Sequence, residues 1–452
     1  MNSNKINLPI VLIALGVLFA VIAIFGNVPI IFVFVALAAL GLVVFFRPEI
    51  GVAALSFSAV ADGLVRTYAG GVGSYWDDAL YALIVVAVVW KLAKEGQFKI
   101  KSGIVWWAVA TFFALSVISG LLSSLPCGHI LTAIRSVLQG SIIFFVIINA
   151  NFDRKVILHV ASLMILCAVV VAGYGLLQRA SGAFTPQGWL DKKEAVNITR
   201  ATSFLGSPNA TAGFLALVLP MSIGMALKVK KLLPKIIYFA FAAIIFFGLY
   251  ATLNRAAWIG LGLGLCVFAI ASGKRWWIGI FMVLLASAIL LLPDLRLRFS
   301  TIFSDEFAIR DASLGRTFRW DTALQIFSEH PFFGIGPGGF GGAVAYGIQA
   351  FGGLYVDNYY LLILSNYGLF GIASFLFLLA SSVRDAFRGL RAALEKDRYL
   401  VAGIIGGMVA FCVHLLFENL WDITPLNISF WIMAGMAASF AYKERRNENE
   451  GS

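Results

Sequence analysis

The chain has 452 residues, of which 60% are hydrophobic and 13% are charged, and its mean hydropathy is +0.91. A soluble protein of this length would divide into two or three domains, but it could not hide so much apolar surface from water. The composition therefore excludes a soluble multidomain architecture. Alternating polar and apolar residues are also absent, which disfavours an outer-membrane barrel. The four cysteines form no CxxC pair and predict neither a disulfide framework nor a metal site.

Apolar runs of roughly 18 or more residues, each long enough to cross a bilayer, recur along the chain. They predict an all-α, polytopic membrane protein with about 12 to 14 transmembrane helices in one integral membrane domain, residues 1–452. The third candidate span is the weakest because it contains Asp62 and many small residues. The candidate spans are residues 8–25, 28–46, 48–65, 76–93, 103–122, 128–150, 155–178, 208–227, 234–253, 255–272, 275–293, 358–383, 399–418 and 424–442.

The distribution of Lys and Arg between the connections predicts the orientation. If the N-terminus is cytoplasmic, the cytoplasmic segments hold 22 of the 34 basic residues and carry a net charge of +13, whereas the outer segments carry −2. This pattern follows the positive-inside rule and predicts that both termini are cytoplasmic. Topology thus explains the overall charge of +11, and no nucleic-acid partner is expected.

Arginine dominates the outer side. Its guanidinium stays charged at low dielectric and grips phosphate oxygens through two parallel hydrogen bonds, so an anionic, oxygen-rich ligand is expected there. Any one of these residues could instead pair with a lipid phosphate or a loop carboxylate. Arg135 lies inside a predicted span, where a charge usually faces a cavity or a partner. The ten outer arginines are Arg66, Arg135, Arg179, Arg200, Arg255, Arg296, Arg298, Arg310, Arg316 and Arg319.

Only two connections are long, residues 179–207 and 294–357, and both are predicted on the outer, periplasmic side. Long ordered loops in a compact protein tend to be functional. In the second loop, amphipathic spacing between Arg316 and Phe327 predicts a short helix at the membrane surface, which His330 and the following proline would end. The glycines from Gly334 to Gly339 then predict a tight turn whose backbone can approach a ligand closely.

Four elements within residues 199–371 occur in a distinctive order. They read RATSFLGSPN from Arg200, LNRAAW from Leu253, RTFRWDTALQIFSEHPFFGIGPGGF from Arg316, and DNYYLLILSNYGLFG from Asp357. Together they resemble the shared core of the O-antigen ligase and O-antigen polymerase superfamily. The resemblance implies a GT-C-like membrane fold and a glycosyltransferase that uses neither a metal nor another cofactor.

The resemblance also implies a reaction and a location. An undecaprenyl-diphosphate-linked oligosaccharide would donate its glycan to a hydroxyl of a glycan or glycolipid acceptor. This would take place among the lipids of the bacterial inner membrane, at its periplasmic face. Ligases of the family usually have His before Asn where this chain has Asp357 and Asn358. This departure favours an O-antigen or exopolysaccharide polymerase over a ligase that attaches the glycan to lipid A-core or another acceptor.

Transfer from a diphosphate requires stabilisation of the leaving phosphate and deprotonation of the attacking hydroxyl. We expect Arg200, Arg255 and Arg319 to clamp the diphosphate, with Arg316 and Arg66 as further candidates. Asp357 is the expected base or orienting group, and Glu418 and Asp422 are its rivals for acid–base work. The remaining expected substrate-binding residues are Asn209, Asn358, Gly336 and His330, although His330 would equally well cap the end of its helix.

A transporter or flippase of a lipid-linked anionic substrate is the alternative from another class of protein. The same arginines would then select the phosphate without any bond being broken. A transporter should carry comparable polar features on both faces and at mid-membrane, whereas this chain concentrates its motifs in two outer loops. The sequence therefore favours the transferase.

Overall fold

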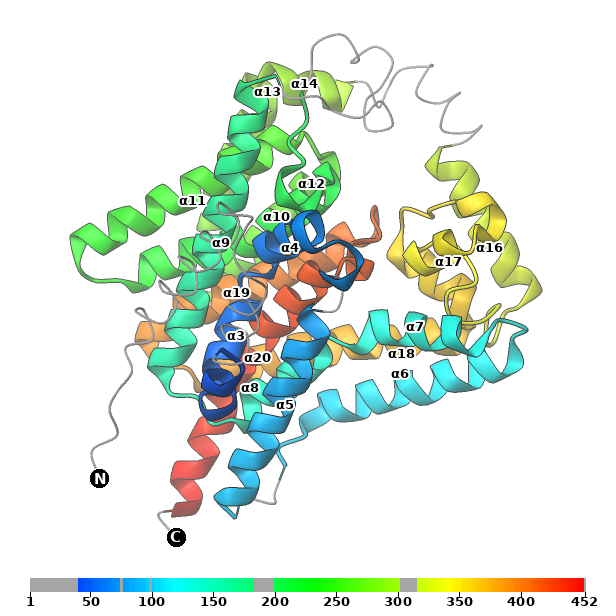
Figure 1. The fold of residues 1–452 in the computed structure, drawn as a ribbon. Helices are drawn as coiled ribbons and strands as arrows, with labels where there is room; N and C mark the ends of the chain where they lie inside the picture. Colours follow the sequence, from blue (N-terminus) through cyan, green and yellow to red (C-terminus); the bar gives the residue numbers. More distant parts are fainter. Residues whose placement is uncertain (1–39, 74–75, 97–99, 183–198, 301–314, 451–452) are drawn as a thin grey trace.

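The computed structural model describes residues 40–73, 76–96, 100–182, 199–300 and 315–450. Within these ranges all regular secondary structure is helical, as predicted (Figure 1). The α-helices are α3 (Pro48–Leu55), α4 (Ser58–Gly73), α5 (Trp76–Lys94), α6 (Gly103–Leu122), α7 (Cys127–Leu138), α8 (Ser141–Asn149), α9 (Arg154–Ala180), α10 (Pro208–Lys228), α11 (Leu232–Thr252), α12 (Arg255–Ala271), α13 (Trp277–Leu291), α14 (Pro293–Ser300), α16 (Arg316–Glu329), α17 (Ala343–Gly347), α18 (Tyr359–Ala392), α19 (Glu395–His414) and α20 (Thr424–Glu450). The short 3₁₀ turns are η2 (Ser203–Leu205), η4 (Ala350–Gly353) and η5 (Leu420–Asp422).

The chain is a helical membrane protein. Among the described residues, six helices are long and apolar enough to cross a membrane, and eight spans result if each of two bent helix pairs is one span. The bent pairs are α3 with α4, at 74°, and α7 with α8, at 46°. Most of the first two predicted spans lies outside the described residues, so the total of 12 to 14 spans stays a prediction.

Helix α10 lies at the centre of the bundle and packs on α19, α12 and α11. Small residues allow its neighbours to come close, because a Cβ atom added at Gly407 of α19 would stand 1.9 Å from the carbonyl oxygen of Leu217. Such close backbone approach is typical of helix contacts in membranes, where dispersion contacts replace the hydrophobic effect as the main attraction. The tightly packed core therefore gives the outer ends of these helices fixed positions.

Helix α18 is broken at Gly368, which has φ 67° and ψ −163°. The turn segment 331–336 fills the break and satisfies its backbone groups. The N–H groups of Ile335 and Gly336 donate to the carbonyl oxygens of Ser365 (3.1 Å) and Asn366 (3.0 Å), and the N–H of Leu369 donates to the carbonyl oxygen of Pro331 (2.8 Å). Unpaired backbone groups are costly in hydrocarbon, so this segment is an integral part of the membrane-facing fold.

The described residues of the second long connection, 294–300 and 315–357, fold mainly into helices. Helix α16 begins at Arg316 and ends at Glu329 with His330 as its C-cap, which confirms the helix predicted there. Of its apolar residues, Ala323 and Ile326 are buried in the protein, whereas Phe318 and Leu324 are 38% and 46% exposed. Helices α16 and α17 lie together beside the ends of α6, α7 and α18 (Figure 1). Residues 301–314 of this loop, and residues 183–198 of the first, lie outside the described ranges.

Candidate functional site

Arg200 is fixed against the end of α11. The backbone N–H of Ala201 donates to the carbonyl oxygen of Ala251 (2.9 Å), and the Nε of Arg200 donates to the carbonyl oxygen of Thr252 (3.0 Å). Its Nη2 donates to the Oδ1 of Asn209 (3.3 Å), in the first turn of α10. The side chain is only 7% exposed. The segment before α10 therefore holds Arg200 at the adjoining ends of α10 and α11.

The junction between α11 and α12 carries two further polar residues to the same place. Leu253 adopts a left-handed conformation (φ 53°), which turns the chain within two residues. Asn254 caps α12 by accepting a hydrogen bond from the N–H of Ala257 (2.9 Å), and its Nδ2 donates to the Oδ1 of Asn209 (2.7 Å). Arg255 is the first residue of α12 and is half-buried. The two family motifs around Arg200 and Arg255 thus meet at Asn209.

Helix α16 brings Arg316 to Glu418, which follows the end of α19. The Nη2 of Arg316 donates to the Oε1 of Glu418 at 2.7 Å, and the side chain of Glu418 is 7% exposed. Burial raises the pKa of this carboxyl to about 7; Arg316 opposes the rise, Asp357 adds to it, and Asn209 and Arg200 oppose it. Glu418 therefore interacts electrostatically with Arg200 and Asn209 of the first motif and with Arg316 of α16.

The same helix pairs Arg319 with Asp357. The Nη1 of Arg319 donates to the Oδ2 of Asp357 and to the carbonyl oxygen of Tyr355 (3.2 Å). Asp357 has φ 51°, so its backbone is in the left-handed region. Burial raises the pKa of its carboxyl, and the charges of Arg319 and Arg316 act in the opposite direction. Two Arg–carboxylate pairs, one turn apart on α16, consequently face the turns before α18 and after α19.

Asn358 and His330 occupy helix ends. The Oδ1 of Asn358 accepts from the backbone N–H groups of Tyr360 (3.0 Å) and Leu361 (3.1 Å) and so caps α18. His330 is exposed at the end of α16, where its carbonyl oxygen accepts from the N–H of Gly334 (3.1 Å). Asn358 therefore caps α18 directly after Asp357, whereas His330 lies at the end of α16 opposite to Arg316 and Arg319. Their expected part in sugar binding stays a prediction.

The glycine turn makes close contacts with the protein itself. A Cβ atom added at Gly336, which has φ 106°, would stand 2.4 Å from the Cβ of Ser123 between α6 and α7. The Nε2 of His129 lies 2.8 Å from the carbonyl oxygen of Gly338. Asn366, which the sequence did not single out, accepts from the N–H of Phe340 (2.8 Å) and donates to the carbonyl oxygen of the same residue (2.8 Å). The turn is thus held between α18 and the α6–α7 connection.

The sequence also singled out three residues that do not form these Arg–carboxylate pairs: Arg66, Asp422 and Arg135. Arg66 belongs to α4, but its side chain lies outside the described part of the structure. Asp422 of η5 accepts from the N–H of Ala343 at 3.2 Å, and burial raises its pKa to about 6. Arg135 forms an ion pair with Asp78 of α5, which is the partner that a charged residue in a span requires.

The described residues contain no group of three or more His, Cys, Asp or Glu side chains that could hold a metal ion. The site contains the guanidinium groups of Arg200, Arg255, Arg316 and Arg319, which can bind an anion, and the carboxylates of Glu418 and Asp357, which can accept a proton. Most of these residues were predicted from the sequence. Asn254 was missed, although an Asn directly before the first residue of an apolar helix is a recognisable N-cap signal.

Comparison with known proteins agrees with the motif resemblance. The family model described as O-antigen ligase matches residues 239–376. This range contains Arg255, Arg316, Arg319 and Asp357, whereas Arg200 and Glu418 lie outside it. No curated protein matches the chain. The family match supports glycan transfer of the O-antigen ligase and polymerase type in general. Residues 239–376 thus match the O-antigen ligase family model, in agreement with the resemblance of the motifs.

Proposed function

We propose that this protein transfers a glycan from an undecaprenyl-diphosphate-linked donor to a carbohydrate hydroxyl at the outer face of the bacterial inner membrane, as an O-antigen or exopolysaccharide polymerase does. The observation that carries the proposal is that four arginines, the buried carboxylate of Glu418 and the partly buried carboxylate of Asp357 come together from two long connections and two helix junctions. Attachment to a separate glycolipid acceptor, as in a ligase, is the second form of the same reaction.

The arginines would bind the diphosphate. Arg255 lies at the N-terminus of α12, where backbone N–H groups and the helix dipole favour an anion. Arg200 is oriented beside it through Thr252 and Asn209. Arginine can chelate phosphate oxygens through two hydrogen bonds, and such contacts strengthen as charge develops on the leaving group. These groups would thereby lower the barrier to leaving-group departure without proton transfer to the phosphate.

The carboxylates would handle the proton. The acceptor oxygen forms a bond to the anomeric carbon, the bond from that carbon to the diphosphate oxygen breaks, and undecaprenyl diphosphate leaves with the electron pair. The proton of the acceptor hydroxyl passes to a carboxylate. Glu418, with a pKa of about 7, suits this work near neutral pH, and Asp357 is the second candidate.

The ion pairs suggest how donor binding would prepare the base. Arg316 and Arg319 can turn from Glu418 and Asp357 towards an incoming diphosphate, because both arginines are partly exposed. Each carboxylate would then lose a neighbouring positive charge, and its pKa would rise further. A more basic carboxylate would therefore be available only when the donor is in place.

Polymer formation by membranes that contain Arg255→Lys, Arg319→Lys and Asp357→Ala variants tests the assignment. Each change should lower the rate at least tenfold, because lysine keeps the charge but loses the paired donors, and alanine removes the carboxylate. Arg384→Lys is the matched control, since Arg384 is exposed on the distant half of α18. Wild-type rates in all three variants would reject the proposed site.

The reaction class can be tested with purified protein. Extension of a lipid-linked oligosaccharide without any energy source is expected for the transferase. A ladder of chain lengths would indicate a polymerase, whereas a single addition to a separate glycolipid would indicate a ligase. Protein that forms no new glycosidic bond but moves lipid-linked glycan in response to an ion gradient would be a transporter.

A further inference from the structure

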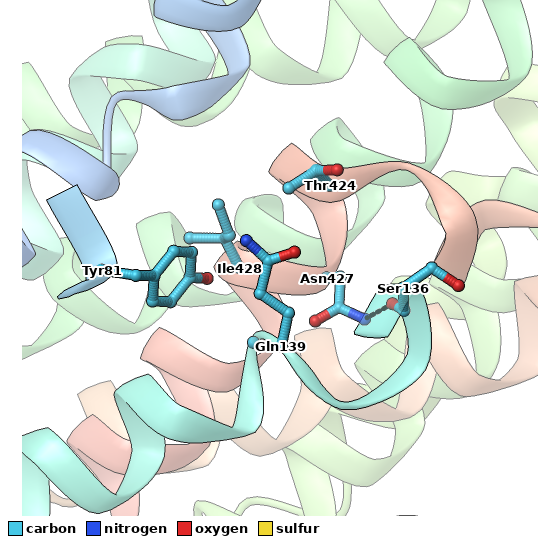
Figure 2. Close-up of a pocket in the computed structure, with 7 residues that line it drawn as sticks. Tyr81, Ser136, Gln139, Thr424, Asn427 and Ile428 are labelled. Atoms are coloured by element: carbon cyan, nitrogen blue, oxygen red, sulfur yellow. Dashed lines mark hydrogen bonds between the residues drawn. The ribbon is translucent and has the colours of Figure 1, made fainter. Parts of the chain in front are cut away.

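A polar recess lies where α5, the bend between α7 and α8, and the first turn of α20 meet (Figure 2). Its cavity volume is about 10 Å³, which is the room that one water-sized group occupies. It is lined by Tyr81, Ser136, Gln139, Gly140, Thr424, Asn427 and Ile428. None of these residues belongs to the candidate site described above.

Asn427 presents an acceptor to this recess. Its Nδ2 donates to the carbonyl oxygens of Ser136 (3.3 Å), Val137 (3.4 Å) and Trp421 (3.3 Å), which fixes the orientation of the amide. The Oδ1 therefore points the opposite way, as Figure 2 shows. This oxygen has no hydrogen-bond partner among the described residues, although the side chain is only 3% exposed. Buried polar atoms are rarely left in this condition.

Tyr81 and Gln139 complete the polar lining. The hydroxyl of Tyr81, in a side chain that is 4% exposed, also lacks a partner within the described ranges. The Nε2 of Gln139 donates to Asp78 (2.7 Å) and more weakly to Asp77 (3.4 Å). Because the amide nitrogen faces these carboxylates, its oxygen faces the other way, towards the side of Asn427 and Thr424 (Figure 2). The recess thus offers two amide acceptors and one hydroxyl.

This set of atoms matches one hydroxyl group. A hydroxyl can donate to the Oδ1 of Asn427 and accept from the O–H of Tyr81, and it fits the available volume. A sodium ion would need more oxygen ligands than the unpartnered atoms supply, and no carboxylate lines the recess. Sugars are the hydroxyl-rich partners that the proposed function already requires.

The recess is connected to the candidate site by one short stretch of chain. Glu418 belongs to that site, and Asn427 lies nine residues further on, after η5. The Nε1 of Trp421 in η5 donates to the carbonyl oxygen of Val137 (2.9 Å), which holds this stretch against α7. At the edge of the recess, Gln139 donates a hydrogen bond to Asp78. Asp78 forms an ion pair with Arg135, and the two side chains are 30% and 46% exposed, respectively. Polar side chains of α7 thus continue from the recess to the protein surface at Arg135.

We propose that this recess binds one hydroxyl of the acceptor glycan, as a subsite separate from the arginines that bind the diphosphate. The proposal rests on the proposed function, because the glycan is the acceptor of that reaction. It assigns acceptor recognition to neutral side chains of α5, α7 and α20, and donor recognition to the loops. Substitutions in the two groups should then affect two different binding constants.

Tyr81→Phe is the test variant, because it removes a hydroxyl that has no hydrogen-bond partner among the described residues. The probe is the free oligosaccharide that mild acid releases from the lipid-linked donor, and its binding to purified protein is measured by calorimetry. Loss of one neutral hydrogen bond should weaken binding about fivefold. Ser58→Ala is the matched control: it removes another buried, unpartnered hydroxyl, outside the recess, and should leave binding unchanged.

The lipid-linked donor provides the second arm. Arg255→Lys should weaken binding of the donor but not of the free oligosaccharide, and Tyr81→Phe should raise the acceptor KM without changing the KM for the donor.

Unchanged oligosaccharide binding in Tyr81→Phe, or no binding by the wild-type protein, would overturn the subsite. A Tyr81→Phe effect that disappears when choline replaces sodium would assign the recess to a cation instead. Oligosaccharide binding without any glycan transfer would leave the subsite standing and reject the proposed function.

Discussion

Arg316 and Glu418 are separated by 102 positions in the sequence, yet the Nη2 of one lies 2.7 Å from the Oε1 of the other. The pair joins the helix of the second outer loop to the turn that follows α19. Its carboxylate is buried, whereas its guanidinium is partly exposed. The arrangement leaves the cation accessible to an anionic ligand and keeps the carboxylate in a low-dielectric environment.

Glycan transfer should depend on pH through Glu418. A base must be deprotonated, so the rate at low donor concentration should rise as the pH increases through about 7, the pKa of this carboxyl in the protein without donor. Glu418→Gln should lower the rate about 100-fold or more and remove this limb from the pH profile. Rates measured between pH 5 and 9 in purified protein test this. An unchanged profile in Glu418→Gln would leave Asp357 as the base.

The same carboxyl should make stability depend on pH in the opposite direction. Its pKa in the folded protein, about 7, lies above its ordinary value of 4.5, so the folded state binds more protons between these two values. Its contribution to stability is therefore present below pH 4.5 and is lost as the pH rises through about 7. Thermal unfolding midpoints of the wild type should fall more over this interval than those of Glu418→Gln. Parallel curves would contradict the assignment.

Arg319 and Asp357 should behave as a coupled pair. Because their side chains form one ion pair, Arg319→Lys and Asp357→Asn each disturb the same interaction. The loss of rate in the double variant should consequently be smaller than the product of the two single losses. A double-mutant cycle on polymer formation measures the coupling. Strict multiplication of the two effects would mean that the residues act independently.

Asn254 has two functions that substitution can separate. Asn254→Ala removes both the cap of α12 and the contact with Asn209, so stability should fall by about 1 kcal/mol and donor binding should weaken. Asn254→Ser keeps a capping oxygen but does not reach Asn209. Its unfolding midpoint should stay close to that of the wild type while its donor KM rises. Equal loss of stability in both variants would count against this division.

The break in α18 should tolerate no side chain at Gly368. Its φ of 67° is unfavourable for other residues, and an added Cβ would stand 2.3 Å from the carbonyl carbon of Phe332. Gly368→Ala should lower stability by about 2 kcal/mol or more. Gly173→Ala in α9 is the control: nothing lies within 4 Å of its added Cβ, and alanine favours the helix. Similar unfolding midpoints for both variants would argue against the strained geometry.

Local signals predicted much of this molecule. The helix from Arg316 to His330 could be recognised because a proline and a glycine run follow its amphipathic part, and the junction at Leu253 and Asn254 was visible as a short interruption between apolar runs. Which apolar residues of α16 are buried in the protein could not be predicted. Packing against α18 selects Ala323 and Ile326, and that contact depends on residues more than 30 positions away.

Site residues that lie in sequence motifs could be predicted. The contacts that tertiary folding creates between them could not. Arg200 and Arg255 were chosen from their motifs, and both motifs do meet at Asn209. Glu418 could be placed only near an outer mouth, because its burial and its pairing with Arg316 arise from α16 folding back over the turn after α19. Helix α19 itself ends at His414 and not at residue 418, so the predicted span was four residues too long at this end.

The break at Gly368 also has a consequence for biogenesis. The N–H and carbonyl groups that the break releases are paired with residues 331–336, and in hydrocarbon each of them left unpaired would cost several kcal/mol. Helix α18 therefore cannot settle in the bilayer before the preceding loop segment has docked on it. Membrane insertion of this helix and folding of the loop that carries Arg316 and Arg319 must then be completed as one event.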